Sequence, residues 1–182
     1  LTEAKERGAH IVAFDPRLTN TAALAHEWVP IKPGSDGALL LALMNVLVTE
    51  KLYDAAFVDK YTVGFAALAD YLLDKTPGWA AHLTNVPADT IRRLARELAA
   101  QRPACGVDPS WHGAWGSLYG NSLQTARAAL CLNALLGSYG TVGGLVFPPK
   151  PNLAALPFPS LPPVSAKRAD GVGDGHFPLA SL

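Results

Sequence analysis

The sequence predicts an α/β fold, a Rossmann-like three-layer domain with a small, mainly parallel sheet. Two observations predict it. Short apolar runs alternate with helical segments along the chain, which is the order of a parallel sheet covered by helices. The first of these runs is apolar at nearly every position, as in a strand buried on both faces. With 182 residues, the chain is long enough for one domain with a sizeable core.

Three segments are predicted to be strands. Residues 10–14 are nearly all apolar and end at an Asp-Pro pair. Residues 27–32 alternate enough in polarity to form a second short strand. Residues 103–107 are the third candidate, and Cys105 would then lie in the interior of the sheet.

Most other regular segments are predicted to be helices. Gly8 ends the opening helix as a glycine that follows the last helical residue. Ser35 and Asp36 supply N-cap chemistry for a helix that runs to about Thr49, and this helix is apolar almost all round and should be buried. Pro87 opens an amphipathic helix with its arginines outward. The remaining predicted helices are residues 18–25, 54–61, 65–74, 77–83 and 122–136.

The distribution of proline predicts a boundary near residue 146. Eight of the 15 prolines lie in the last fifth of the chain, from Pro148 onward. Proline lacks the backbone donor that helices and central strands need, so this part cannot be either. We therefore predict an α/β domain over residues 1–146 and a Pro-rich extended tail over residues 147–182.

Charge and cysteine content exclude several classes of protein. Fifteen basic and fifteen acidic residues give a net charge of zero, which argues against a nucleic-acid or anionic-membrane surface. Cys105 and Cys131 lack the spacing of a zinc ribbon or of a self-contained iron–sulfur site. The longest apolar stretch is interrupted by Asn45 and is too short to span a membrane. We predict no catalytic residue and no metal ligand, because no known arrangement of such residues appears.

The first candidate site is Asp15, at the end of the first predicted strand. An acid at this place in a doubly wound fold accepts hydrogen bonds from the ribose hydroxyls of a dinucleotide. The glycine-rich phosphate turn of such a fold would then precede Leu1. Alternatively, Asp15 and Pro16 form an ordinary turn that ends the strand. The residue alone leaves both interpretations open.

The second candidate site is the turn Pro33-Gly34-Ser35-Asp36 at the start of a predicted helix. A carboxylate there could accept two parallel hydrogen bonds from the N1–H and N2–H₂ groups of a guanine. The alternative is that Ser35 or Asp36 only caps the helix, which contributes about 1 kcal/mol.

The third candidate site is the aromatic loop that contains Trp111 and His112, between a predicted strand and a predicted helix. Ligands of open α/β sheets bind beyond the carboxyl ends of the strands, where His112 could contact a cofactor or donate a proton. The loop could equally pack against another domain. The glycines from Gly137 to Gly144 resemble a phosphate loop only weakly, and a helix C-cap followed by a turn accounts for them better.

An ordered series of motifs points to a known family. The chain contains, in order, Asp15-Pro-Arg17, Pro30-Ile-Lys-Pro-Gly-Ser-Asp36, Val86-Pro-Ala-Asp-Thr-Ile91 and Leu132-Asn-Ala-Leu-Leu-Gly137. This series resembles the molybdopterin oxidoreductases, the family of dimethyl sulfoxide reductase and formate dehydrogenase, over about residues 1–150. The stretch from Tyr119 to Gln124 looks most similar to the polysulfide, thiosulfate and tetrathionate reductase branch.

The resemblance implies a binding domain for one molybdopterin guanine dinucleotide. It places Asp15 and Arg17 at the guanosine or its phosphates, and the turn with Ser35 and Asp36 at the guanine. The loop with Trp111 and His112 would approach the pterin or the metal.

The resemblance also implies that the chain is an internal part of a larger catalytic subunit that reduces a polysulfide or a sulfur oxyanion. A molybdenum bis(molybdopterin guanine dinucleotide) cofactor would serve electron transfer in anaerobic respiration. A [4Fe-4S] cluster is expected in a part of the subunit before Leu1. The partners would be the other domains of the subunit and an iron–sulfur electron-transfer subunit, and relatives in this branch work outside the cytoplasmic membrane.

The 182 residues alone are expected to be inactive, because the Cys or selenocysteine that ligates the metal in the family has no counterpart here. An alternative function is a non-catalytic Rossmann-like domain that binds a nucleotide or a protein. The metal and pterin content of the full-length protein would separate the two.

Overall fold

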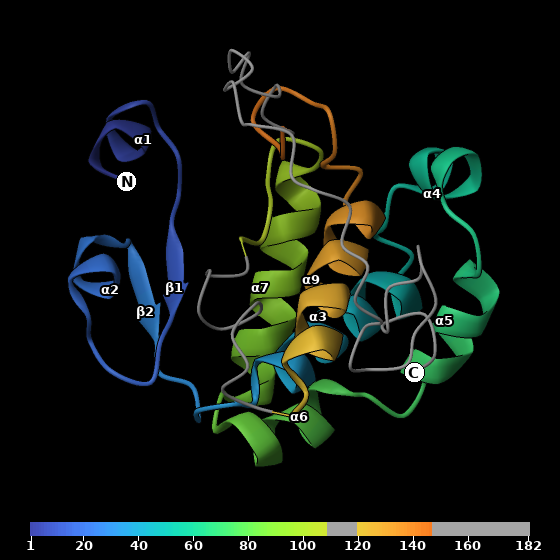
Figure 1. Ribbon diagram of the computed structural model, residues 1–182, viewed down its shortest axis with the longest axis horizontal. Coiled ribbons are helices and arrows are strands. Elements are labelled where there is room, and N and C mark those ends of the chain that lie inside the picture. Colours follow the sequence, from blue (N-terminus) through green and yellow to red (C-terminus); the bar gives the residue numbers. More distant parts are fainter. Residues whose placement is uncertain (109–119, 147–182) are drawn as a thin grey trace, which may run out of the picture. The chain divides into compact units, whose positions relative to one another are not determined.

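The computed structural model describes residues 1–108 and 120–146, which form a two-stranded parallel sheet and a group of helices around α3 (Figure 1). The described elements, in chain order, are α1 (Thr2–Glu6), β1 (Val12–Phe14), α2 (Asn20–Leu24), β2 (Glu27–Val29), α3 (Asp36–Thr49), α4 (Ala55–Tyr61), α5 (Phe65–Leu72), α6 (Pro77–Thr84), α7 (Ala88–Gln101) and α9 (Ser122–Leu135).

The sheet consists of β1 and β2, which lie side by side and run in the same direction (Figure 1). Val12 pairs with Glu27 and Phe14 pairs with Val29. The connection between the strands contains α2, which Thr19 caps by accepting a hydrogen bond from the amide of Ala22 at 3.3 Å. The prediction of two parallel strands is confirmed, with each strand shorter than its predicted range.

The predicted third strand is wrong. Residues 103–108 form no strand, and Val107 instead pairs with the side-chain amide of Asn133 on α9. Pro103 has no amide hydrogen to give to a ladder, and this buried side-chain amide takes the place of a neighbouring strand. Cys105 is therefore half-buried outside any strand, and Cys131 is only partly buried on α9.

The fold class is accordingly confirmed only in part. The described residues are mostly helical around a small parallel sheet, and they do not show a Rossmann-like three-layer domain. The apolar periodicity predicted the helices correctly. A three-layer domain requires a sheet with helices packed on both faces, and the two described strands do not form one.

The centre of the core is α3, which packs against α5, α6, α7 and α9. Because its neighbours surround it, its side chains are buried on nearly every side, as predicted. Asn45 is a polar exception inside this core, and its Nδ2 donates to the carbonyl oxygen of Leu72 at 2.7 Å. That hydrogen bond satisfies the buried amide and holds the end of α5 against α3.

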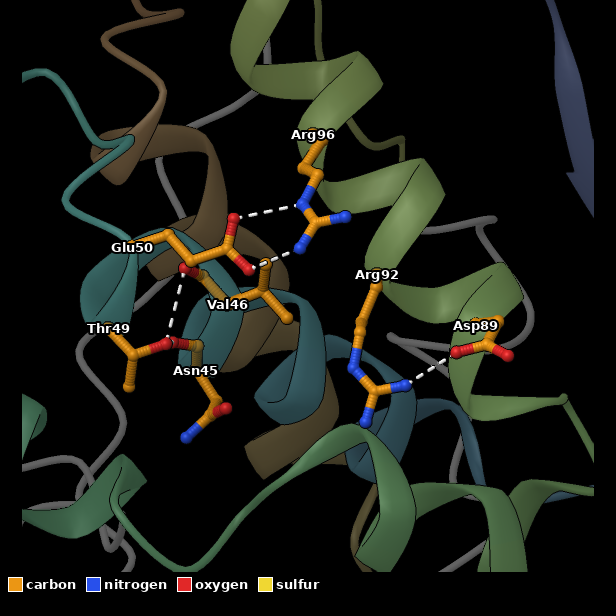
Figure 2. A network of polar contacts seen from close by, with 7 residues as sticks. All are labelled: Asn45, Val46, Thr49, Glu50, Asp89, Arg92 and Arg96. Carbon is orange, nitrogen blue, oxygen red and sulfur yellow. Dashed lines mark hydrogen bonds and ion pairs between the residues drawn. The ribbon is translucent and has the colours of Figure 1, made fainter.

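The outward face of α7 carries ion pairs that connect it to other elements. Arg93 pairs with Glu27 of β2, and Arg96 makes two hydrogen bonds to the carboxylate of Glu50 just after α3, at 2.8 and 2.9 Å. Figure 2 shows Nε and Nη2 of Arg96 directed at Glu50, while Arg92 reaches Asp89 within its own helix. These contacts confirm the outward orientation predicted for the arginines and connect α7 to β2 and to the end of α3.

The Glu50–Arg96 pair should give a small, salt-sensitive stabilisation. The hydrogen bond from Arg96 lowers the pKa of Glu50 below its ordinary value. With the folded pKa below the unfolded one, this stabilisation is present above the ordinary glutamate pKa and is lost as pH falls through the lowered value. The Glu50→Gln protein should therefore melt slightly below wild type at neutral pH.

Thermal unfolding at several pH values and salt concentrations measures this difference. It should shrink at acid pH and in high salt, because the pair is largely exposed. Asp59→Asn, at an exposed acid with no ion pair among residues 1–108 and 120–146, serves as the control. A difference that persists undiminished in about 1 M salt, where charges are screened within about 3 Å, would contradict the electrostatic origin.

Candidate functional site

Two of the predicted site segments follow the carboxyl ends of the two strands. Asp15 comes directly after β1, and its amide donates to the carbonyl oxygen of Val29, the last residue of β2, at 3.3 Å. The turn at Gly34 begins a few residues after the end of β2. Because parallel strands end at the same edge of a sheet, both segments leave from the edge where ligands of open α/β sheets bind.

The carboxylate of Asp15 organises the turn after β1. Its Oδ1 accepts from the amide of Arg17 at 3.1 Å, and its Oδ2 accepts from the hydroxyl of Thr19 at 2.9 Å. This is the turn that the Asp-Pro pair predicts, and the carboxylate of Asp15 stabilises it through these two hydrogen bonds. Arg17 is exposed, and its guanidinium has no hydrogen bond or ion pair within the described part of the chain.

The turn before α3 depends on a glycine. Gly34 has φ of 76°, a left-handed conformation that disfavours other residues. Ser35 occupies the N-cap position, but its hydroxyl donates back to the carbonyl oxygen of Lys32 at 2.6 Å and does not cap the helix. Within residues 1–108 and 120–146, the backbone amides of Asp36 and Gly37 have no acceptor.

Asp36 is the first residue of α3 and is only partly buried. Its carboxylate makes no hydrogen bond or ion pair in the described ranges. The prediction that Ser35 or Asp36 merely caps the helix is therefore wrong for Ser35, and the described contacts give Asp36 no capping bond. The carboxylate can accept hydrogen bonds from a ligand, and the two amides, which have no acceptor among the described residues, can donate hydrogen bonds to the same ligand.

The first turn of α9 packs against this turn, which the sequence did not indicate. The Nδ2 of Asn121 donates to the carbonyl oxygen of Gly34 at 3.4 Å. A Cβ on Gly37 would lie 3.0 Å from Oγ1 of Thr125, so only a glycine allows this approach without adjustment. The available signal was a glycine in the first turn of an otherwise apolar helix, which indicates close contact with another element.

Gly37→Ala tests this contact. The added methyl group should cost about 1–3 kcal/mol by overpacking, against a gain of up to about 1 kcal/mol in helix propensity. In a Thr125→Ala background the obstruction is gone, so the same substitution should be neutral or stabilising. Chemical denaturation of both single variants and the double variant measures the coupling. Strict additivity of the two substitutions would show that the residues do not touch in solution.

The remaining predicted residues, Trp111 and His112, lie outside the described residues. The chain leaves the described part at Asp108, directly after Val107, and returns at Gly120 before α9. Val107 is fixed by two hydrogen bonds to Asn133, each 2.8 Å long. Sequence reasoning missed Asn133, because an asparagine inside an apolar helix gives no sign of its distant partner.

The glycines after α9 form a helix end and a turn, as predicted. Gly137 has φ of 67°, and its amide donates to the carbonyl oxygen of Ala134 at 3.1 Å. Tyr139 and Leu145 then pair in an isolated bridge that closes the turn.

The cysteines are not placed as metal ligands. Within residues 1–108 and 120–146, no group of three or more His, Cys, Asp or Glu side chains could hold a metal ion. Burial raises the pKa of the Cys105 thiol, and its sulfur lies 3.3 Å from the carbonyl oxygen of Leu98 as a hydrogen-bond donor. A raised pKa disfavours the thiolate that binds metals. In the same ranges, no helix is both long and apolar enough to cross a membrane.

Comparison with known proteins identifies the family. Residues 1–170 match the molybdopterin oxidoreductase family, and the chain belongs to it. It is 39% identical to the thiosulfate reductase molybdopterin-containing subunit PhsA of Salmonella typhimurium, an alignment that covers 93% of this chain and 24% of that protein. It is also 37% identical to the dimethyl sulfoxide reductase DmsA of Escherichia coli, over 79% of this chain and 20% of that protein.

Among solved structures, the chain resembles acetylene hydratase from Pelobacter acetylenicus with a TM-score of 0.61 and 30% identity. That match covers 77% of this chain and 19% of the hydratase. The chain therefore spans about a quarter or less of the length of these relatives.

Proposed function

We propose that this chain is the part of a molybdenum oxidoreductase that binds a molybdopterin guanine dinucleotide. The observation that carries the proposal is Asp36, a partly buried carboxylate at the start of α3. Among the described residues it has no partner, and the two backbone amides beside it have no acceptor. Family membership supports a molybdopterin guanine dinucleotide as the ligand.

The residues of the turn suit the guanine end of such a cofactor. The carboxylate of Asp36 can accept hydrogen bonds from the N1–H and N2–H₂ groups of guanine, and the adjacent amides can donate to its carbonyl oxygen. Gly34 provides the left-handed turn that precedes these amides, with Pro33 before it and Ser35 after it.

The residues after β1 suit the sugar and phosphates. Arg17 is an exposed guanidinium without a partner in the described ranges, and it can bind a phosphate with two parallel hydrogen bonds. Asp15 already accepts two hydrogen bonds within its turn, but each carboxylate oxygen has a further lone pair for a ribose hydroxyl. Trp111 and His112 are proposed to contact the pterin end.

The bound cofactor would supply two-electron chemistry at its molybdenum, while this chain holds and orients it. The named relatives support that division of labour. They include reductases named for thiosulfate, dimethyl sulfoxide and arsenate, and a hydratase named for acetylene. Because these enzymes differ in substrate, we expect the stretch of sequence that they share to bind the cofactor that they have in common.

The substrate and partners are proposed from similarity. The 39% identity to a thiosulfate reductase subunit over 93% of the chain favours a sulfur oxyanion or polysulfide as the substrate of the full-length enzyme. The chain would then be an internal part of a catalytic subunit whose other domains carry the second pterin, the metal ligand and a [4Fe-4S] cluster. An iron–sulfur subunit would deliver the electrons.

Metal and nucleotide analysis of the full-length protein tests the proposal. We expect molybdenum or tungsten and two guanine nucleotides, released as GMP by acid hydrolysis, for each chain. The alternative of a non-catalytic nucleotide-binding or interaction domain requires a protein without metal and pterin. A full-length protein that is purified after anaerobic expression and contains neither would exclude the proposed function.

A further inference from the structure

The amino ends of α3 and α9 meet at the turn that is proposed to bind guanine. Each helix is 14 residues long, and the two pack against each other (Figure 1). Asn121 precedes α9, and its Nδ2 donates to the carbonyl oxygen of Gly34. A Cβ on Gly37 would lie 3.8 Å from this nitrogen and 3.0 Å from Oγ1 of Thr125. Two side chains of α9 and its N-cap therefore lie against the first turn of α3.

The hydroxyl of Thr125 forms no hydrogen bond in residues 1–108 and 120–146, although the residue is only 7% exposed. A threonine inside a helix usually bonds through its hydroxyl to the carbonyl oxygen three or four residues earlier. Here the carbonyl oxygen of Asn121 accepts from the backbone amide of Thr125 instead. Burying a hydroxyl without a partner is unfavourable, and a ligand atom that bonds to it would remove this cost.

The oxygen of Thr125 remains open to a ligand. Among residues 1–108 and 120–146, the side-chain atom that is fully enclosed without a hydrogen bond is Oγ of Ser138. Oγ1 of Thr125 also lacks a hydrogen bond but is not enclosed in this way, so one side of it faces solvent.

The same oxygen lies close to a backbone donor, the amide of Gly37, which has no acceptor among the described residues. A Cβ is about 2.5 Å from the amide nitrogen of its own residue, so Oγ1 of Thr125 is at most about 5.5 Å from the amide nitrogen of Gly37. Two hydrogen bonds of about 2.9 Å can bridge that distance. A single acceptor atom of a ligand can therefore bind both groups.

We propose that Thr125 is a specificity-determining residue of the guanine site, and that its hydroxyl and the amide of Gly37 donate to the carbonyl oxygen O6 of the base. This inference rests on the proposed function. Guanine presents N2–H₂, N1–H and O6 in a row along one edge. Asp36 would accept from the first two groups, and the next residue, Gly37, would donate to the third together with Thr125. Adenine has an amino group in place of O6, so the same donors would oppose it.

Thr125→Ala and Thr125→Ser in the full-length protein form a matched pair. Both substitutions remove the same methyl group, and the two variants differ only in the hydroxyl. In protein prepared without cofactor, Thr125→Ala should melt at the same temperature as Thr125→Ser or higher, because the hydroxyl has no partner there and alanine is the better helix former. The order should be reversed for nucleotide binding. The Kd for GDP, measured by titration calorimetry, should be about three- to tenfold higher in Thr125→Ala, as expected for the loss of one neutral hydrogen bond.

The base atom is tested with 6-thio-GDP, in which sulfur, a weaker hydrogen-bond acceptor, replaces O6. The wild-type protein and Thr125→Ser should bind GDP more tightly than 6-thio-GDP. Thr125→Ala should lose about three- to tenfold of this preference, because the donor that distinguishes the two atoms is gone.

Three results would contradict these expectations. An equal Kd for GDP in Thr125→Ala and Thr125→Ser would overturn the role of Thr125 and leave the proposed function standing. A clearly lower melting temperature of Thr125→Ala than of Thr125→Ser, without cofactor, would show that the hydroxyl has its partner within the fold and would overturn the role as well. A wild-type full-length protein that contains no guanine nucleotide after anaerobic expression would overturn the proposed function itself.

Discussion

Asp36→Ala is expected to remove most of the guanine nucleotide from the full-length protein while changing its stability little. The two hydrogen bonds proposed between the carboxylate and guanine contribute about 1.5–3 kcal/mol each, and about 3–6 kcal/mol together. That range corresponds to an affinity lower by about two to four powers of ten. Because the carboxylate of Asp36 makes no hydrogen bond in residues 1–108 and 120–146, folding should lose only its favourable interaction with the helix dipole, about 0.3–1 kcal/mol.

Asp89→Ala is the matched control for this experiment. Asp89 is also an acid in the first turn of a helix, α7, and it is almost fully exposed. It should lose a similar small amount of stability, together with the weak exposed ion pair that Asp89 makes with Arg92, and its nucleotide content should be unchanged. Measurement of GMP and of the melting temperature separates the two roles. A normal nucleotide content in Asp36→Ala, with a lowered melting temperature, would leave Asp36 a role in helix stability only.

Gly144→Ala is expected to be the most destabilising single substitution in the turn after α9. A Cβ at this position would overlap the carbonyl oxygen of Ser138 and would lie 2.9 Å from that of Pro103. Both obstacles are backbone atoms, which cannot rotate away as a side chain can. The ladder bond from the amide of Leu145 to Ser138, at 2.7 Å, would be strained as well. We expect a loss of about 3 kcal/mol, the upper end of the usual cost of overpacking.

Gly140→Ala separates crowding from backbone conformation. Gly140 has φ of 74°, but a Cβ there would meet nothing within 4 Å. Its replacement should cost only the left-handed conformation, about 1–2 kcal/mol. Denaturant unfolding of the two variants gives the comparison. A smaller loss for Gly144→Ala than for Gly140→Ala would mean that the turn is looser in solution than these distances require.

The helices were predictable because their signals are local. An apolar face repeats every three to four residues, and Gly8, Pro87 and Gly137 mark helix ends through their own backbone preferences. The predicted bounds of α3 and α9 and the predicted start of α7 accordingly agree with the structure to within about two residues. Family membership was predictable for a similar reason, since the order of short motifs along the chain is itself a property of the sequence.

The structure corrected the sequence where a group forms a hydrogen bond with a partner other than the one that its local pattern predicts. Ser35 has the right residue type for an N-cap, but the carbonyl oxygen of Lys32 takes its hydroxyl. Residues 103–107 have the composition of a strand, but Asn133 supplies the partner that a strand would need. Propensity measures only the conformation that a segment prefers in isolation. These outcomes depend instead on the hydrogen-bond partners that the rest of the chain supplies.

By itself, the sequence determined the helices, the two parallel strands, the outward charges of α7 and the family. Only the tertiary structure decided that α9 touches Gly34 and Gly37 at one end and Val107 at the other. The hydrogen bonds among these contacts join residues that are 26 and 87 positions apart. No local sequence pattern predicts these contacts. They form only when α9 packs against α3 and so places the amino ends of the two helices.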